Sequence, residues 1–160
     1  MEFSLAVANF FVGKSLSTGK ELTPMKVVKL VYISHGWYLA LKKEPLLSEA
    51  VEAWKYGPVV RNVYDSFKKF GNSRITEFAF DLDIMTYPKI SNENTNAFLN
   101  KIWDVYGHFT GIQLSALTHQ ENTPWDIVWN KENGKDKIGA TIPNELIEKH
   151  YIKKIATNAK

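Results

Sequence analysis

Hydrophobic residues recur at helical spacing through most of the chain. In residues 2–16 they fall three or four positions apart, which predicts an amphipathic first helix. Residues 24–41 are apolar on almost every side, a pattern typical of a helix buried in a core. Thr23 is suited to cap this helix and Pro24 to open it. We therefore expect residues 24–41 to form the central helix of the fold.

The remaining periodic segments predict further helices and a small β element. Pro58 is expected to open a helix that ends at Gly71, and four more helices are predicted for 91–109, for 110–117, and from Pro124 and Pro143 onward. Alternation with period 2 is weak in residues 50–56 and clear in residues 76–85, so these two segments are expected to pair as a ribbon. The predicted fold is mainly α: a compact single-domain helical bundle that covers residues 1–157.

Composition agrees with a globular protein whose core needs no disulfide bonds or structural metal ions. The chain has 160 residues, of which 44% are hydrophobic and 23% charged. On folding, a chain of this length buries about 68–70% of the surface that its unfolded form exposes. It has no cysteine, which excludes a disulfide framework, a Cys-bound zinc site and thiol catalysis. The net charge of +3 is weakly basic and the lysines are scattered, so nucleic-acid binding is permitted but not favoured.

The N-terminal sequence indicates no targeting segment. It lacks the basic leader and the small-residue cleavage site of a secretory signal. No apolar run approaches the roughly 18 residues that span a bilayer. We expect a cytoplasmic protein without membrane contact.

Sequence motifs for chemistry are sparse. There is no Gly-rich phosphate loop, G-x-S-x-G or H-E-x-x-H. His35 lies on the buried helix, where a hydrogen-bonded core histidine is favoured over a ligand. Asp81 and Asp83 share one face of a predicted strand, and a solvent face is favoured over a Mg²⁺ site. We expect no enzyme activity, no metal and no cofactor.

The stretch WKYGPVV combines rigid and contact-forming residues. Alternation places Trp54 and Tyr56 on one face, which we assign inward, and Lys55 on the other face. Gly57 permits a tight bend and Pro58 fixes the backbone after it. Arg61 is expected to join Lys55 in a basic edge.

The stretch HQENTPW divides in the same way. Trp125 is expected in the core after the helix-opening Pro124, together with Trp37 and His35 of the central helix. The expected partner contacts lie in the two loops: Lys55, Tyr56, Gly57, Pro58, Arg61, His119, Gln120 and Glu121.

Three segments together resemble one known family. They are MKVVKLVYISHGWYLAL, EAWKYGPVVRNVYDSFKKFG and VYGHFTGIQLSALTHQENTPW. In order and wording they resemble the Panacea domain, also described as the SocA-like antitoxin domain or as a phage-associated protein. The resemblance runs from about Phe3 to Tyr151.

The resemblance implies a function as well as a fold. Panacea domains are mainly helical and occur as antitoxins beside diverse small toxins, on phages and other mobile elements. The resemblance therefore implies a protein toxin as partner, encoded next door and neutralised by direct contact, with no catalytic residues or cofactor. Whether the protein also forms a homo-oligomer is left open by the resemblance.

Two other functions stay open from the residues themselves. A transcriptional autoregulator would use the helix after Pro58, which offers Arg61, Asn62, Lys68 and Lys69 but also Asp65. A protease adaptor is the related regulatory alternative. A metal-dependent enzyme would be built on His119, Glu121, Asp81 and Asp83.

Overall fold

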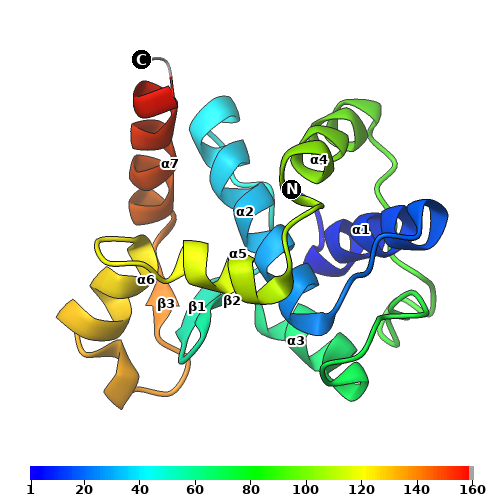
Figure 1. The fold of residues 1–160 in the computed structure, drawn as a ribbon, viewed down its shortest axis with the longest axis horizontal. Coiled ribbons are helices and arrows are strands. Elements are labelled where there is room, and N and C mark those ends of the chain that lie inside the picture. Colours follow the sequence, from blue (N-terminus) through cyan, green and yellow to red (C-terminus); the bar gives the residue numbers. More distant parts are fainter. Residues whose placement is uncertain (159–160) are drawn as a thin grey trace.

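Helix α2 (Pro24–Lys42) runs through the middle of the computed structural model, which describes residues 1–158 (Figure 1). Of its 19 residues 14 are buried, which confirms the predicted central helix. Thr23 caps it by accepting the N–H of Lys26, and Pro24 occupies the first turn. Five helices pack around it: α1 (Ser4–Thr18), α3 (Arg61–Phe67), α4 (Glu93–Tyr106), α5 (Gly111–Thr118) and α7 (Asn144–Asn158).

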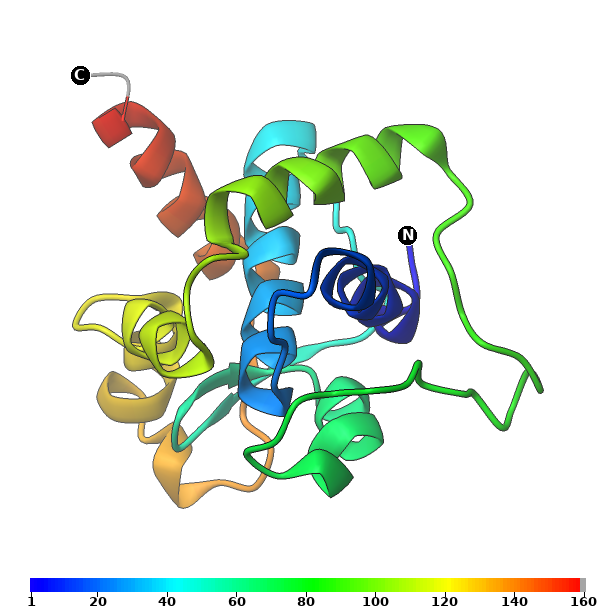
Figure 2. The ribbon, with the colours of Figure 1, turned by 45° about the vertical axis from the view of Figure 1, so that its right-hand side comes forward.

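The helices approach α2 from several directions. In Figure 2, α4 crosses one end of α2, α1 lies beside it, and the small sheet lies at the opposite end. Thr110 opens α5 with a capping box, in which Thr110 and Gln113 bond each other's backbone N–H. A short α6 (Pro124–Asp126) continues into a π-helical turn, Ile127–Lys131. The prediction of a mainly helical protein is confirmed.

The β element is a small antiparallel sheet of three strands. Strand β1 (Val51–Trp54) lies between β2 (Gly57–Val59) and β3 (Thr141–Ile142). Pro58 pairs with Ala53, and Val59 pairs with Glu52. The prediction that Pro58 opens a helix is wrong, because Gly57–Val59 pair with β1 and α3 begins only at Arg61.

Residues 76–85 do not form the predicted strand. The side-chain amide of Asn9 on α1 bonds both the N–H (2.8 Å) and the C=O (3.0 Å) of Ala79 and thereby takes the place of a neighbouring strand. Asp81 then accepts the N–H groups of Asp83 (2.9 Å) and Ile84 (3.4 Å) in a tight turn. Strand β1 therefore pairs with β2 and β3, and not with this segment.

Because residues 76–85 form no strand, their side chains are also exposed differently from the prediction. The alternating apolar residues predicted to face the core are 40–76% exposed: Phe78, Phe80, Leu82 and Ile84. The buried residue of the segment is Ala79, which faces Asn9. We refer to Asp81–Thr86, closed by a bridge between its ends, as the 81–86 turn.

Buried polar residues of α2 bond to segments far along the chain. His35 is 1% exposed; its Nδ1 accepts the N–H of Leu47 (3.3 Å), and its Nε2 lies 2.9 Å from Asn144 Oδ1. Trp37 Nε1 donates to Tyr106 Oη on α4 (2.8 Å). The helix is therefore joined to its neighbours by hydrogen bonds as well as by apolar packing.

The contact between α2 and α7 leaves no space at Gly36. A methyl group there would overlap the ring of Tyr151, which is 3% exposed and held edge-on by Trp37 and Tyr32. Gly36→Ala should therefore lower the free energy of unfolding by about 1–3 kcal/mol, as overpacking does elsewhere. Urea unfolding followed by circular dichroism measures this change.

Gly13 on α1 provides the matched control. A methyl group there meets only the Phe78 ring, at 3.7 Å, so Gly13→Ala should be neutral or raise the free energy of unfolding by up to about 1 kcal/mol. Equal destabilisation by both variants would contradict the tight α2–α7 contact.

Candidate functional site

The hairpin between β1 and β2 has a two-residue tip, Lys55 and Tyr56. The paired residues that flank it are Trp54 and Gly57. Gly57 has a φ of 118°, which other residues rarely adopt. A Cβ atom at Gly57 would also lie 2.8 Å from Lys29 Nζ, so a larger residue here would displace the end of the Lys29 side chain.

Three side chains from three different helices hold the hairpin by its carbonyl groups. They bond alternate residues, at positions 54, 56 and 58. The pairs are Trp125 Nε1 with Trp54 O, Ser115 Oγ with Tyr56 O (2.7 Å), and Lys29 Nζ with Pro58 O (2.9 Å). The backbone of the hairpin is thus fixed by hydrogen bonds from the helices beneath it, while the side chains at its tip are exposed to solvent.

The orientation of β1 is the reverse of the expected one. Val51 and Ala53 are the buried residues, at 1% and 2% exposure, so the assignment of Trp54 and Tyr56 to the inward face is wrong. Tyr56 is 60% exposed, and Trp54 is half-buried against the edge of Tyr64. Both faces of the strand carry apolar residues, which is why alternation alone assigned the wrong one.

Arg61 does not form the expected basic edge with Lys55. Its guanidinium makes a two-pronged ion pair with Glu52, with Nη2–Oε1 and Nε–Oε2 distances of 2.8 and 3.1 Å. It also lies over the Trp54 ring, 5.0 Å from the centroid. Glu52 on β1 therefore neutralises the positive charge of Arg61.

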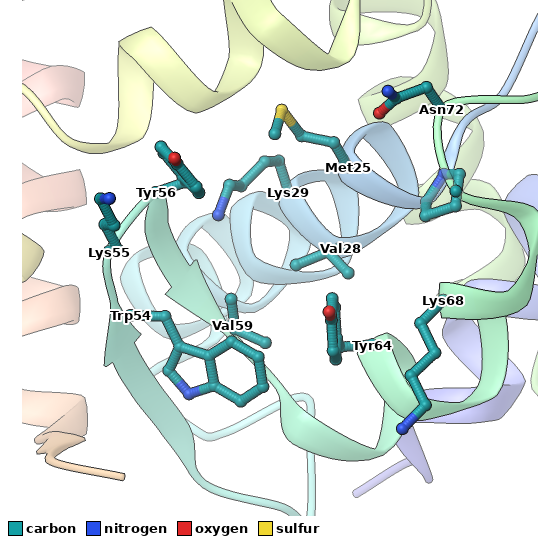
Figure 3. A pocket seen from close by; sticks show the side chains of 12 residues that line it. Met25, Val28, Lys29, Trp54, Lys55, Tyr56, Val59, Tyr64, Lys68 and Asn72 are labelled. Atoms are coloured by element: carbon teal, nitrogen blue, oxygen red, sulfur yellow. The ribbon is translucent and has the colours of Figure 1, made fainter. Parts of the chain in front are cut away.

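A pocket of about 340 Å³ opens beside the hairpin tip (Figure 3). We call it the hairpin pocket. It lies between α2, the hairpin and the segment from α3 to Asn72. Its lining is apolar and basic and includes no carboxylate: Pro24, Met25, Val28, Lys29, Trp54, Lys55, Tyr56, Val59, Tyr64, Lys68, Gly71 and Asn72.

Lys29 is the unusual residue of this pocket. It reaches from α2 toward the hairpin between Tyr56 and Val59 (Figure 3) and is only 2% exposed. Burial lowers the pKa of its ammonium to about 7, because the charged form has lost most of its hydration. A buried amine that titrates near neutral pH, in a pocket, is typical of a functional residue.

The second predicted contact loop lies against the base of the hairpin. His119 ends α5; its Nδ1 lies 3.3 Å from Ser115 Oγ, and its ring meets Trp125 edge-on at 5.3 Å. His119 thus supports the two donors that hold Trp54 and Tyr56. Gln120 and Glu121 are exposed in the loop before Pro124.

The structure divides the predicted contact residues into two groups. Lys55, Tyr56, Arg61, Gln120 and Glu121 are exposed, whereas Gly57 and Pro58 are buried and His119 is half-buried. Sequence reasoning missed Lys29 and Ser115. The signal for Lys29 was available, since it is one of the few polar residues, with Lys26, Ser34 and His35, that interrupt the apolar pattern of this helix.

The proposed metal ligands do not assemble. Within residues 1–158, no three His, Asp or Glu side chains are grouped so that they could hold a metal ion. Asp81 and Asp83 belong to the 81–86 turn, where Asp81 accepts backbone N–H groups.

Within residues 1–158, every helix is too short or too polar to cross a bilayer.

Comparison with known proteins identifies the family. The model for "Antitoxin SocA-like, Panacea domain" matches residues 27–126. The chain belongs to this family. The match extends from α2 to α6 and so includes Lys29, the hairpin, Ser115 and Trp125, which together form the site.

A curated relative in this family is similar over almost the same length. The Panacea-domain chain is 28% identical over 151 residues to Antitoxin SocA of Caulobacter vibrioides (strain NA1000 / CB15N), which covers 91% of the chain and 80% of the relative. A search of solved structures finds no significant match. The predicted family resemblance is confirmed.

The buried ammonium of Lys29 makes stability depend on pH. Its pKa is 10.5 in an ordinary environment and about 7 here, so between these values the unfolded chain binds more protons than the folded one. The contribution of Lys29 to the free energy of unfolding should therefore rise with pH, by roughly 2 kcal/mol between pH 7 and pH 9.

Urea unfolding of the wild type and of Lys29→Met at pH 7, 8 and 9 isolates this contribution. The free energy of unfolding of the wild type minus that of Lys29→Met should rise with pH. Every other titrating group is present in both proteins, so its effect cancels in this difference. A difference that stays constant over this range would mean that Lys29 keeps an ordinary pKa.

Proposed function

We propose that the protein is an antitoxin that neutralises a protein toxin by binding it directly, without catalysis. The observation that carries this proposal is the similarity to Antitoxin SocA over 91% of the chain. A similarity of this extent includes most of the chain, and the family match over residues 27–126 includes the hairpin.

The surface around the hairpin tip supports a contact function. Tyr56 is 60% exposed, and Lys55 Nζ lies over its ring at 5.4 Å from the centroid. Aromatic residues contribute a large share of the binding energy at protein interfaces. Because the backbone of the hairpin is already held at residues 54, 56 and 58, binding here requires little ordering of the chain.

The DNA-binding alternative is less well supported by the charges. The cations expected to contact phosphate are each paired with a carboxylate: Arg61 with Glu52, Lys68 with Asp65 and Lys69 with Glu77. Helix α3, which would be the recognition helix, is only 7 residues long. We therefore propose contact with a protein rather than with an operator.

A growth and inhibition assay tests the proposal. The product of the adjacent gene, expressed alone, should stop growth, and co-expression of this protein should restore it. The purified toxin should also lose its activity when only this protein is added, because direct neutralisation needs no protease. Rescue in cells without inhibition in the purified mixture would favour the adaptor alternative, and a harmless neighbour that does not co-purify would overturn the proposal.

Matched tyrosine variants test which surface makes the contact. Tyr56→Ala should weaken toxin binding by about 30-fold, the equivalent of a 2 kcal/mol interface residue, as measured by calorimetry. Tyr87 beside the 81–86 turn is 57% exposed and serves as control; Tyr87→Ala should change the affinity by less than about threefold. The reverse result would move the contact from the hairpin tip to that turn.

A further inference from the structure

The hairpin pocket combines an apolar lining with one buried cation. Trp54, Val59 and Tyr64 form one side of it, and Val28 and Met25 of α2 form another (Figure 3). Lys29 is the buried cation, while Lys55 and Lys68 are exposed. Lys68 at the rim is paired with Asp65, so Lys29 and Lys55 are the cations that give this pocket, whose lining includes no carboxylate, a preference for an anion with an apolar body.

The ammonium of Lys29 has donors to spare. Within residues 1–158, Pro58 O at 2.9 Å is the protein acceptor that bonds it. An ammonium carries three N–H donors, so two are free for a ligand. A carboxylate in the pocket would supply both hydrogen bonds and the counter-charge that the buried amine lacks.

We propose that the hairpin pocket receives a short segment of the toxin that carries a large apolar side chain beside a carboxylate, with the carboxylate bonded to Lys29 Nζ. The identity of this occupant rests on the function proposed above. The apolar side chain packs between Trp54, Val59 and Tyr64, and the remainder of the segment leaves the pocket across Tyr56.

The position and size of the pocket favour a protein segment. At about 340 Å³ it lies near the lower end of ligand-site volumes, about 300–1,000 Å³, and accommodates one large side chain. Lys55 and Tyr56 belong both to its lining and to the exposed hairpin tip. A segment anchored in the pocket would therefore be continuous with a partner that covers the tip.

Binding should depend on pH through Lys29. A carboxylate favours the protonated amine, and burial lowers the pKa of this amine to about 7, so binding takes up protons and tightens as the pH falls from 8 to 6. The other titratable groups of the lining are Lys55, Tyr56, Tyr64 and Lys68. His119 touches the adjoining Ser115 on α5, and Lys29→Met retains all five of these groups.

Two small probes test the pocket without the toxin. N-acetylphenylalanine has a ring and a free carboxylate, and N-acetylphenylalanine amide has the same body without the charge. Titrated into the full chain and followed by ¹H–¹⁵N NMR, the acid should shift the Gly57 N–H and the Trp54 indole N–H saturably. It should bind at least about 10-fold more tightly than the amide, and several-fold more tightly at pH 6 than at pH 8.

Lysine variants separate Lys29 from general charge. Lys29→Met should remove the preference for the acid and its pH dependence, whereas Lys68→Met at the rim should keep both within about threefold. The dispersion of each spectrum reports whether the variant is folded. If Lys29→Met does not fold, the acid–amide difference and the pH series on the wild type decide the matter.

Several results would overturn the inference. Equal affinity for acid and amide, or shifts confined to residues away from Gly57 and Trp54, would mean that no carboxylate site exists here. If 4-phenylbutyrate, a free acid without a peptide group, bound at least 10-fold more tightly than N-acetylphenylalanine, the occupant would be a small molecule and not a toxin segment.

The toxin itself completes the test. Lys29→Met should weaken toxin binding by about 10-fold or more relative to Lys68→Met, and unchanged binding would overturn the proposed occupant. Failure of the two proposals is distinguishable: a harmless neighbour rejects the antitoxin function whatever the probes do. Neutralisation of a real toxin without probe binding rejects only the pocket.

Discussion

The polar groups buried along α2 impose the main constraint on this structure. A helix surrounded by other elements cannot send its polar side chains to water, so each of them must find a partner within the protein. The partners lie on separate segments: Glu21 O and Gly107 O for Lys26, Pro58 O for Lys29, and Leu47 N and Asn144 for His35. The same helix therefore supplies the apolar core and sets the positions of several loops around it.

The sequence predicted the features that depend on local pattern. The central helix was recognisable because α2 is apolar on nearly every side and begins with Thr23 and Pro24. The small β element was predicted too, but its partners were wrong, because the amide of Asn9 bonds Ala79 from 70 residues away. No periodicity in residues 76–85 reveals that a side chain on α1 replaces a neighbouring strand.

The candidate site shows the same division between local and distant information. The two motifs WKYGPVV and HQENTPW were visible as unusual sequence, and the structure places them against each other through Ser115, Trp125 and His119. The contacts that join them link residues 59 and 71 positions apart, between a side chain and a carbonyl group. Such bonds leave no mark on hydrophobic spacing, so Ser115 passed as an ordinary helix residue and Lys29 as an interruption.

The way the hairpin is held has a consequence for how such a protein diversifies. Its main chain is fastened, yet the side chains of Lys55 and Tyr56 point away from every fastening. These two positions can therefore exchange one residue type for another with little penalty to folding, whereas Gly57 cannot. Members of the family with this scaffold can therefore vary the chemistry of the hairpin tip at two adjacent positions without changing the fold beneath it.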